Sequence, residues 1–298
     1  MTEPARRPPK FPLQLDQIAK GPKTPTPTPA RAASSTAVLM PTRPMRPATV
    51  ALARPLLRPQ APLQQAARHA ASRRTPSGLG LDSEDVRARM VDRLRAGGVH
   101  DATVLAAMAC VQRHRFVDTA LVIQAYEDTS LPIGHGQTIS KPSVVARMLE
   151  LLMAGANARV AGQLGRVLEI GTGCGYQAAV LACMARQVVS VERLKALHDK
   201  AAVLLSHERS DRLRLVYGDG MRGHPPNAPY DSIIAAAGGD AVPDAWLDQL
   251  ALGGRLVAPV ETGGGRQALV VVDRTARGLQ QTVHETVQFV PLKSGLVR

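Results

Sequence analysis

The chain has 298 residues, enough to bury a sizeable core, and its hydrophobic fraction of 45% is ordinary for a globular protein. No stretch approaches the roughly 18 to 20 apolar residues of a membrane-spanning helix, and no apolar segment behind a basic start marks a secretory signal. The three cysteines form no CxxC pair and lack metal-ligand spacing with histidine. We therefore expect free thiols in a reducing cytoplasm and no metal site.

The formal net charge of +13 is concentrated near one end of the chain. Residues 1–78 contain 13 Lys and Arg against two acids, so they carry +11 and the rest of the chain only +2. They also hold 15 of the 23 prolines and a single aromatic residue, which leaves too little apolar surface to offset the chain entropy. We expect a disordered tail. An alternative is that the tail is an arm that binds nucleic acid or an anionic surface. A mitochondrial transit peptide is disfavoured, because the acid Glu3 lies near the start and the amphipathic spacing is weak.

Residues 79–298 are expected to form one domain that begins with helices. The spacing predicts a helix over 82–98 that ends in two glycines, and Asp101 can start another helix. A loop-like stretch follows over 126–140. Ser140 is then expected to cap a helix whose first turn contains proline.

From residue 166 the pattern changes to apolar runs that alternate with helical stretches. Five runs are typical of strands, at 167–170, 188–191, 213–216, 232–236 and 256–260. Helices are expected between most of them, around 176–185, 193–206 and 243–250. Two final runs, at 268–273 and 286–290, have no helical pattern between them and predict an antiparallel edge hairpin. The fold class is therefore α/β, with a doubly wound and mostly parallel sheet.

The strongest local motif follows the first of these strands and opens a helix. It consists of Glu169, Gly171, Thr172, Gly173, Cys174, Gly175 and Tyr176. Glycines in such a loop let the backbone approach a ligand closely. A dinucleotide site needs a third glycine where Tyr176 stands, so the spacing favours S-adenosylmethionine over NAD. Glu169 suits the cationic amino-acid end of that ligand.

Two further acids follow the next two strands. Glu192 can accept both ribose hydroxyls, and Asp219, followed by Gly220, can accept from the adenine amino group. Because the carboxyl ends of parallel strands meet at one edge of a sheet, the three acids together predict a single cofactor site. Cys174 is expected to be a small filler in the loop and not a catalytic group.

A second pattern lies mostly outside the cofactor motif. Ala-Tyr-Glu-Asp at 125–128 precedes Leu-Pro-Ile-Gly-His-Gly-Gln-Thr-Ile-Ser at 131–140. Further segments are Arg-His-Arg-Phe-Val at 113–117, Val-Glu-Arg at 191–193, Gly-Asp-Gly at 218–220, Ala-Pro-Tyr-Asp at 228–231, Gly-Gly-Arg-Leu-Val at 253–257 and Phe-Val-Pro-Leu at 289–292. In this order and spacing, over roughly residues 81–298, the chain resembles the protein-L-isoaspartate O-methyltransferase family.

The resemblance implies methyl transfer from S-adenosylmethionine to the free α-carboxylate of isoaspartyl residues in aged proteins and peptides. The ester then collapses to a succinimide, and hydrolysis returns some normal aspartate. A carboxylate with a pKa of about 3.5 is already ionised at neutral pH, so no general base is required. By the same resemblance, Ser140 is the active-site hydroxyl, and the substrate loop is shaped by Tyr126, Asp128, Thr138 and Ile139. We expect a cytoplasmic monomer that needs neither a metal nor a membrane.

The chain departs from the family pattern at Gln112, Ser130, Cys174 and Ala235. None of these removes a group assigned to chemistry, although Ala235, where threonine is frequent, could alter the cofactor or substrate pocket. His135 is expected to position the loop or face solvent, and not to act as a base.

Two other functions are compatible with parts of the sequence. A different S-adenosylmethionine enzyme, acting on a small molecule or nucleic acid, would fit the Pro-Pro-Asn-Ala-Pro-Tyr run at 225–230, which resembles a motif of amino-group methyltransferases. That motif must follow the fourth strand, whereas this run precedes it, and the alanines at 235–237 offer no acceptor for an amine. The second rival, a catalytically silent binding protein that works through its tail, is disfavoured by Ser140 and the three acids.

Overall fold

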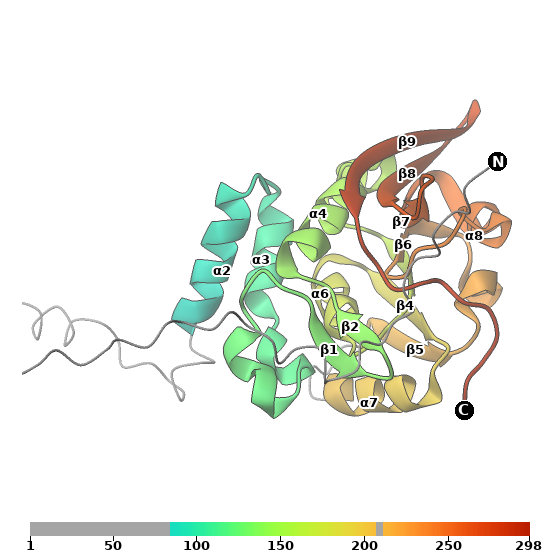
Figure 1. Ribbon diagram of the computed structural model, residues 1–298. Helices are drawn as coiled ribbons and strands as arrows, with labels where there is room; N and C mark the ends of the chain where they lie inside the picture. Colours follow the sequence, from blue (N-terminus) through green and yellow to red (C-terminus); the bar gives the residue numbers. More distant parts are fainter. Residues whose placement is uncertain (1–83, 207–210) are drawn as a thin grey trace, which may run out of the picture. The chain divides into compact units, whose positions relative to one another are not determined.

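The structure, a computed structural model, describes residues 84–206 and 211–298 (Figure 1), so the expected tail at 1–78 lies outside the described residues. Within the described part, no helix has both the length and the apolar character needed to cross a membrane. Nor does that part bring together three or more His, Cys, Asp or Glu side chains in a group that could hold a metal ion.

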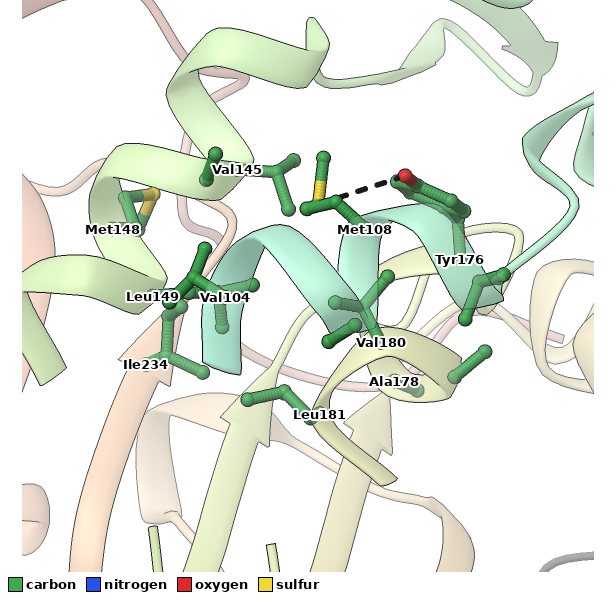
Figure 2. Packing of buried hydrophobic residues seen from close by; sticks show 14 of the residues in the cluster. Val104, Met108, Val145, Met148, Leu149, Tyr176, Ala178, Val180, Leu181 and Ile234 are labelled. Atoms are coloured by element: carbon green, nitrogen blue, oxygen red, sulfur yellow. Dashed lines mark hydrogen bonds between the residues drawn. The ribbon is translucent and has the colours of Figure 1, made fainter. Parts of the chain in front are cut away.

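Two helices precede the sheet, as the sequence predicts. Helix α2 (Glu84–Ala96) has acids in its first turn, and α3 (Ala102–Cys110) is capped by Asp101, whose carboxylate accepts from two backbone amides at 2.9 and 3.0 Å. Val104 and Met108 of α3 are fully buried. Figure 2 shows them packed between α4 and α6, with the Tyr176 hydroxyl 3.7 Å from the Met108 sulfur. This packing joins the lead-in helices to the sheet domain.

The stretch at 126–140 contains two strands, so the expectation of a loop over these residues is wrong. After the short helices η2 (Arg113–Phe116) and η3 (Thr119–Gln124), strands β1 (Leu131–Gly134) and β2 (Gln137–Ile139) form an antiparallel hairpin. Each strand is only three or four residues long, too short for an alternating pattern to stand out in the sequence. At the tip, Gly134, His135 and Gly136 all have positive φ, which glycine adopts at little cost.

Helix α4 (Pro142–Met153) begins with proline as expected, but Ser140 does not cap it. The N-cap position belongs to Lys141, whose side chain makes no capping hydrogen bond. The Asp128 carboxylate supplies the missing acceptor from fifteen residues upstream, since it accepts from the Ser143 amide and from the Ser143 hydroxyl, each at 2.8 Å. The prediction failed because a cap from a distant segment leaves no local sequence signal. Helix α5 (Ala156–Ala161), which the sequence did not predict, follows.

The central sheet has the order β5-β4-β3-β6-β7-β8-β9. Its strands are β3 (Arg166–Ile170), β4 (Gln187–Glu192), β5 (Leu213–Tyr217), β6 (Tyr230–Ala235), β7 (Leu250–Glu261), β8 (Gln267–Thr275) and β9 (Gly278–Val287). The first five pair in parallel and the last two are antiparallel, so the doubly wound sheet with an edge hairpin is confirmed. β9 begins well before the run expected at 286–290, because nearly all its residues are exposed and no apolar pattern marks them.

Helices cover both faces of the sheet. The intervening helices are α6 (Tyr176–Met184), α7 (Lys195–Leu205) and α8 (Asp244–Gln249), with short η5 (Gly220–Arg222) and η6 (Pro225–Asn227) before β6. Alternate strand residues enter two cores: Val167 packs on the side of α3, α4 and α6, whereas Leu168 packs on the side of α8. The chain runs from β3 to β5 on one side and returns to β6 on the other. The carboxyl ends of β3 and β6 therefore frame the crevice where such sheets bind ligands.

Candidate active site

The glycine-rich loop between β3 and α6 is a tight turn. Gly171, Gly173 and Gly175 all have positive φ, at 89, 58 and 93°. A Cβ added to Gly175 would lie only 2.8 Å from the Leu205 Cδ1 atom, so this position also needs glycine for close packing. The loop passes close to the end of β6, since a Cβ on Gly171 would lie 3.6 Å from that of Ala236.

This loop forms one wall of a pocket with a volume of about 240 Å³. Three segments enclose the pocket. The glycine loop contributes Gly171, Thr172, Gly173, Cys174 and Tyr176, the hairpin contributes Ile133, His135, Gln137, Thr138, Ile139 and Ser140, and the carboxy-terminal segment contributes Val290, Pro291, Leu292 and Lys293. The pocket therefore lies at the carboxyl edge of the sheet, beneath two segments that come from opposite ends of the domain sequence.

Glu192 lines this pocket at the end of β4 and is only 5% exposed. Its Oε2 accepts from the Gly173 amide and its Oε1 from the Leu194 amide, both at 2.9 Å. Each carboxylate oxygen has two acceptor sites, so both oxygens can still accept a ligand hydroxyl. One side chain thus shapes the glycine loop and presents a pair of acceptors to the pocket.

Glu169 lies behind the pocket wall and is fully buried. Its Oε2 accepts from the Ser190 hydroxyl at 2.5 Å, and Ser190 pairs in turn with the Thr172 hydroxyl at 2.5 Å. Burial raises the pKa of Glu169 to about 8, although Ser190 and the neighbouring Gln177 amide oppose the shift. The Glu169 Oε1 and the Gln177 Nε2 atoms are both buried. The two side chains lie beside each other, since the Gln177 amide acts on the Glu169 carboxyl as a hydrogen-bond donor, and Gln177 itself lines the pocket.

Asp219 lies at the same edge but does not line the pocket. Its Oδ1 accepts from the Met221 amide at 3.0 Å and its Oδ2 from the Gly295 amide at 2.8 Å. The adjacent Gly220 does line the pocket. The carboxylate therefore holds the carboxy-terminal segment against the end of β5, with its neighbour facing the pocket.

The residues expected to shape the substrate loop are divided between two places. Thr138 and Ile139 line the pocket beside Ser140. Tyr126 and Asp128 instead line a separate hollow of about 570 Å³ next to α4. The Tyr126 hydroxyl is paired with the His114 Nδ1 atom at 2.7 Å. These two residues contact the loop from behind and do not face the pocket.

Ser140 stands where two spaces meet. It lines the pocket of about 240 Å³ and also a larger groove of about 1020 Å³, and the two share Thr138, Ser140, Ala236 and Val290. The side chain is half-buried, and its hydroxyl forms no hydrogen bond with any described residue. Since Lys141 occupies the cap position of α4, the Ser140 hydroxyl can donate to a group placed at this junction.

Some residues of the site were not singled out from the sequence. The carboxy-terminal segment lines the pocket because Gly238 holds it, through hydrogen bonds to the Val290 carbonyl at 2.9 Å and from the Leu292 amide at 2.7 Å. Arg113 contacts the Ser140 backbone from the protein interior. Arg113 and the carboxy-terminal segment both lie in stretches that carried the family resemblance. The resemblance therefore marked these stretches but indicated no role for them.

The structure also locates two of the positions where the chain departs from the family pattern, and the proline-rich run that resembles a motif of amino-group methyltransferases. Cys174 is buried in the pocket wall, and burial raises the pKa of its thiol. Ala235 is fully buried at the end of β6, while Ala236 and Ala237 line the pocket. The proline-rich run at 225–230 precedes β6, so it lies at the strand end opposite the pocket.

Comparisons with known proteins show which family the chain is similar to. The sequence model of a family described as protein-L-isoaspartate(D-aspartate) O-methyltransferase matches residues 85–296. A protein-L-isoaspartate O-methyltransferase of Methylibium petroleiphilum is 57% identical over 99% of this chain and 99% of its own. One of Leptothrix cholodnii is 64% identical, over 80% of this chain and 84% of its own.

Solved structures show the same fold. A protein-L-isoaspartate O-methyltransferase structure is similar with a TM-score of 0.63 and 28% identity, over 70% of this chain and 67% of that one. A Plasmodium falciparum structure, described as a complex with S-adenosyl-L-homocysteine, has a TM-score of 0.60, over 70% of this chain and 98% of that one. At 22% identity, that second likeness shows the fold alone.

Proposed function

The chain belongs to the protein-L-isoaspartate O-methyltransferase family, and we propose that it methylates the α-carboxylate of L-isoaspartyl residues in damaged proteins with S-adenosylmethionine. The observation that carries this proposal is the position of Ser140, whose hydroxyl lies without a hydrogen-bond partner among the described residues, where the pocket and the groove meet. A methyl donor in the first space and a peptide in the second would meet beside this hydroxyl.

The pocket at the ends of β3 and β4 is assigned to the cofactor. Glu192 would accept the ribose hydroxyls, and Gln177, with Glu169 behind it, would face the amino-acid end. Gly220 would lie against the adenine, with Asp219 fixing the carboxy-terminal segment that covers it. When bound, S-adenosylmethionine supplies a methyl group activated by a positively charged sulfur.

Little further chemistry is required of the protein. The substrate carboxylate has a pKa of about 3.5 and is ionised at neutral pH, so no base needs to remove a proton. Ser140 would donate a hydrogen bond to one carboxylate oxygen and leave the other free to attack in line. The hairpin and the carboxy-terminal segment line the pocket and would shield a bound cofactor from water on that side. Exclusion of water favours this reaction, because the carboxylate anion and the sulfonium cation react to give an uncharged ester and an uncharged thioether.

The groove of about 1020 Å³ is assigned to the peptide on either side of the isoaspartyl residue. Thr138 and Ile139 would contact the substrate directly, because they lie beside Ser140. Tyr126 and Asp128 would act on the loop from behind, since Asp128 holds the start of α4 through Ser143. The methyltransferase domain is assigned to residues 79–298, and we expect a chain without residues 1–78 to keep its turnover. A cytoplasmic location and a monomeric state also remain predictions.

The test is transfer of labelled methyl to a matched pair of peptides, one isoaspartyl and one aspartyl. We expect the wild type to label only the isoaspartyl peptide, and Ser140→Ala to reduce this rate about 10- to 100-fold, as expected when a positioning hydrogen bond is lost. Ser206→Ala is the matched control, because that hydroxyl donates only to the Val203 carbonyl at the end of α7. Equal labelling of both peptides would contradict the substrate assignment, and full activity of Ser140→Ala would contradict the role of the serine.

A further inference from the structure

Arg113, the first residue of η2, is completely buried although its side chain is charged. Arginine is almost never fully buried unless it is paired, and taking its charge out of water costs several kcal/mol. Among the described residues, no carboxylate pairs with Arg113 and its Nη1 atom has no hydrogen-bond partner. The hydrogen bonds that offset this cost go to backbone carbonyls and not to an acid. The contacts that Arg113 does make therefore indicate another role.

Those contacts join the two ends of the substrate loop. The Arg113 Nε atom donates to the Ala125 carbonyl at 2.7 Å, and its Nη2 donates to the Ser140 carbonyl at 2.8 Å. The segment between these two carbonyls contains the hairpin that covers the cofactor pocket. One planar group thus closes the loop at its base and holds the backbone of the residue that carries the active-site hydroxyl.

The same guanidinium also touches the cofactor loop. Its central carbon lies 4.8 Å from the centre of the Tyr176 ring, and Tyr176 begins α6 directly after the glycine-rich turn. Arg113 is therefore in contact with both sides of the junction, the Ser140 side through a hydrogen bond and the cofactor side through a stacked ring. Lysine has a single ammonium and no plane, so it cannot satisfy two carbonyls in this geometry and stack at the same time.

We propose that Arg113 is a positioning residue for methyl transfer: it sets the distance and direction of Ser140 relative to the cofactor loop. The proposal rests on the proposed function, because it acts through the Ser140 hydroxyl. Arg113 reaches neither the pocket nor the groove, so its effect on turnover has to pass through the Ser140 backbone. A purely structural role would lower stability without depending on the Ser140 hydroxyl. Small displacements of a positioning group reduce rates strongly, by about 100-fold for 1 Å.

Arg255 provides a matched control. It is partly buried, and like Arg113 it binds more than one acceptor: the Asp273 carboxylate at 2.7 and 2.8 Å and the Leu151 carbonyl at 2.9 Å. It lines none of the three cavities described above. Replacing it by lysine should lower the melting temperature without a specific effect on methyl transfer.

The experiment uses the full chain with Arg113→Lys, Arg255→Lys, Ser140→Ala and the two double variants of Ser140→Ala. The rate at saturating S-adenosylmethionine and isoaspartyl peptide is measured at a fixed interval below each protein's own Tm. We expect Arg113→Lys to lower kcat about 10-fold or more, with a smaller change in the Kd for S-adenosylmethionine. In the Ser140→Ala background, Arg113→Lys should have almost no additional effect, because the group it positions is gone. Hydrogen exchange should rise across residues 126–140 in Arg113→Lys but not in Arg255→Lys.

Several results would overturn the proposal. Additive effects of Arg113→Lys and Ser140→Ala, or equal kcat losses in the two lysine variants, would give Arg113 only a structural role. The same holds if Arg113→Lys does not fold while Arg255→Lys does. Normal turnover of Ser140→Ala would overturn the serine assignment and this inference together, whereas an impaired Ser140→Ala with additive effects would overturn this inference alone. If the wild type labels no peptide, hydrogen exchange still tests the proposal. Unchanged hydrogen exchange across residues 126–140 in Arg113→Lys would contradict it. Raised hydrogen exchange there in Arg113→Lys but not in Arg255→Lys would support the role of Arg113 in holding the loop.

Discussion

The cofactor side and the substrate side of the pocket are held by different kinds of contact. On the cofactor side, Gly171 and Gly173 bond to Val191 and Glu192, which lie at the end of the adjacent parallel strand. On the substrate side, Ser140 is held by Arg113, and α4 by Asp128, both from separate segments. The cofactor side thus takes its geometry from the register of the sheet and from one carboxylate at the end of β4. The substrate side depends on a few side chains, so single substitutions should loosen it without touching cofactor binding.

The largest expected effect concerns the buried acid on the cofactor side. Burial raises the pKa of Glu169 from 4.5 to about 8, so the folded protein holds a proton that the unfolded chain releases. The unfolding free energy should therefore fall as the pH rises from about 4.5 to 8, by about 5 kcal/mol at most. Glu169→Gln has no such proton, so the stability difference between the two proteins should change over this range. Thermal unfolding at several pH values measures it, and parallel curves would show that Glu169 is ionised in the fold.

Glu192→Gln should weaken cofactor binding most directly. An amide cannot accept from both the Gly173 and Leu194 amides, and hydrogen bonds to charged groups contribute about 1.5 to 3 kcal/mol. We expect an approximately 10- to 100-fold higher Kd for S-adenosylmethionine by calorimetry. Glu285→Gln is the control, because its ion pair with Arg147 at 2.8 Å is largely exposed and contributes less than about 1 kcal/mol. Equal Kd values for the two variants would mean that Glu192 does not organise the cofactor side.

Asp128→Asn tests whether the substrate side can be loosened alone. The variant loses the charged acceptor for the Ser143 amide and hydroxyl, and a lost helix cap costs about 1 kcal/mol. We expect KM for the isoaspartyl peptide to rise roughly fivefold while the Kd for S-adenosylmethionine stays constant. Asp118→Asn serves for comparison, because Asp118 caps η3 through the Ala120 amide and lines none of the three cavities. A parallel rise in the cofactor Kd would show that the two sides are not independent.

The smallest expected effect concerns charge in the groove. Among the described residues that line it, only Lys141 and Arg266 carry charge, and both are positive. Arg266→Glu should raise KM about two- to fivefold for isoaspartyl peptides with acidic neighbours, and high salt should reduce the difference. Arg277→Glu, in the exposed turn between β8 and β9, is the control of equal charge change. A KM that is independent of peptide charge would place the acidic neighbours outside the groove.

The sheet and its glycine loop were predictable because their signals are local or periodic. Apolar runs marked β3 to β8, and the glycines at 171–175 marked the loop after β3, where the structure shows three positive φ angles. The hairpin at 131–139 and the start of β9 were missed, since one has strands too short for a pattern and the other is exposed along almost its whole length.

By itself the sequence determined the alternation of strands and helices, the edge hairpin and the place of the glycine loop after β3, because each depends on neighbours in the chain or on a repeating pattern. Tertiary structure alone decided that Asp219 binds Gly295, that Asp128 caps α4, and that the Ser140 hydroxyl has no partner among the described residues. These contacts join segments far apart in the chain, and local conformational preference carries no information about which distant acceptor a backbone amide will meet.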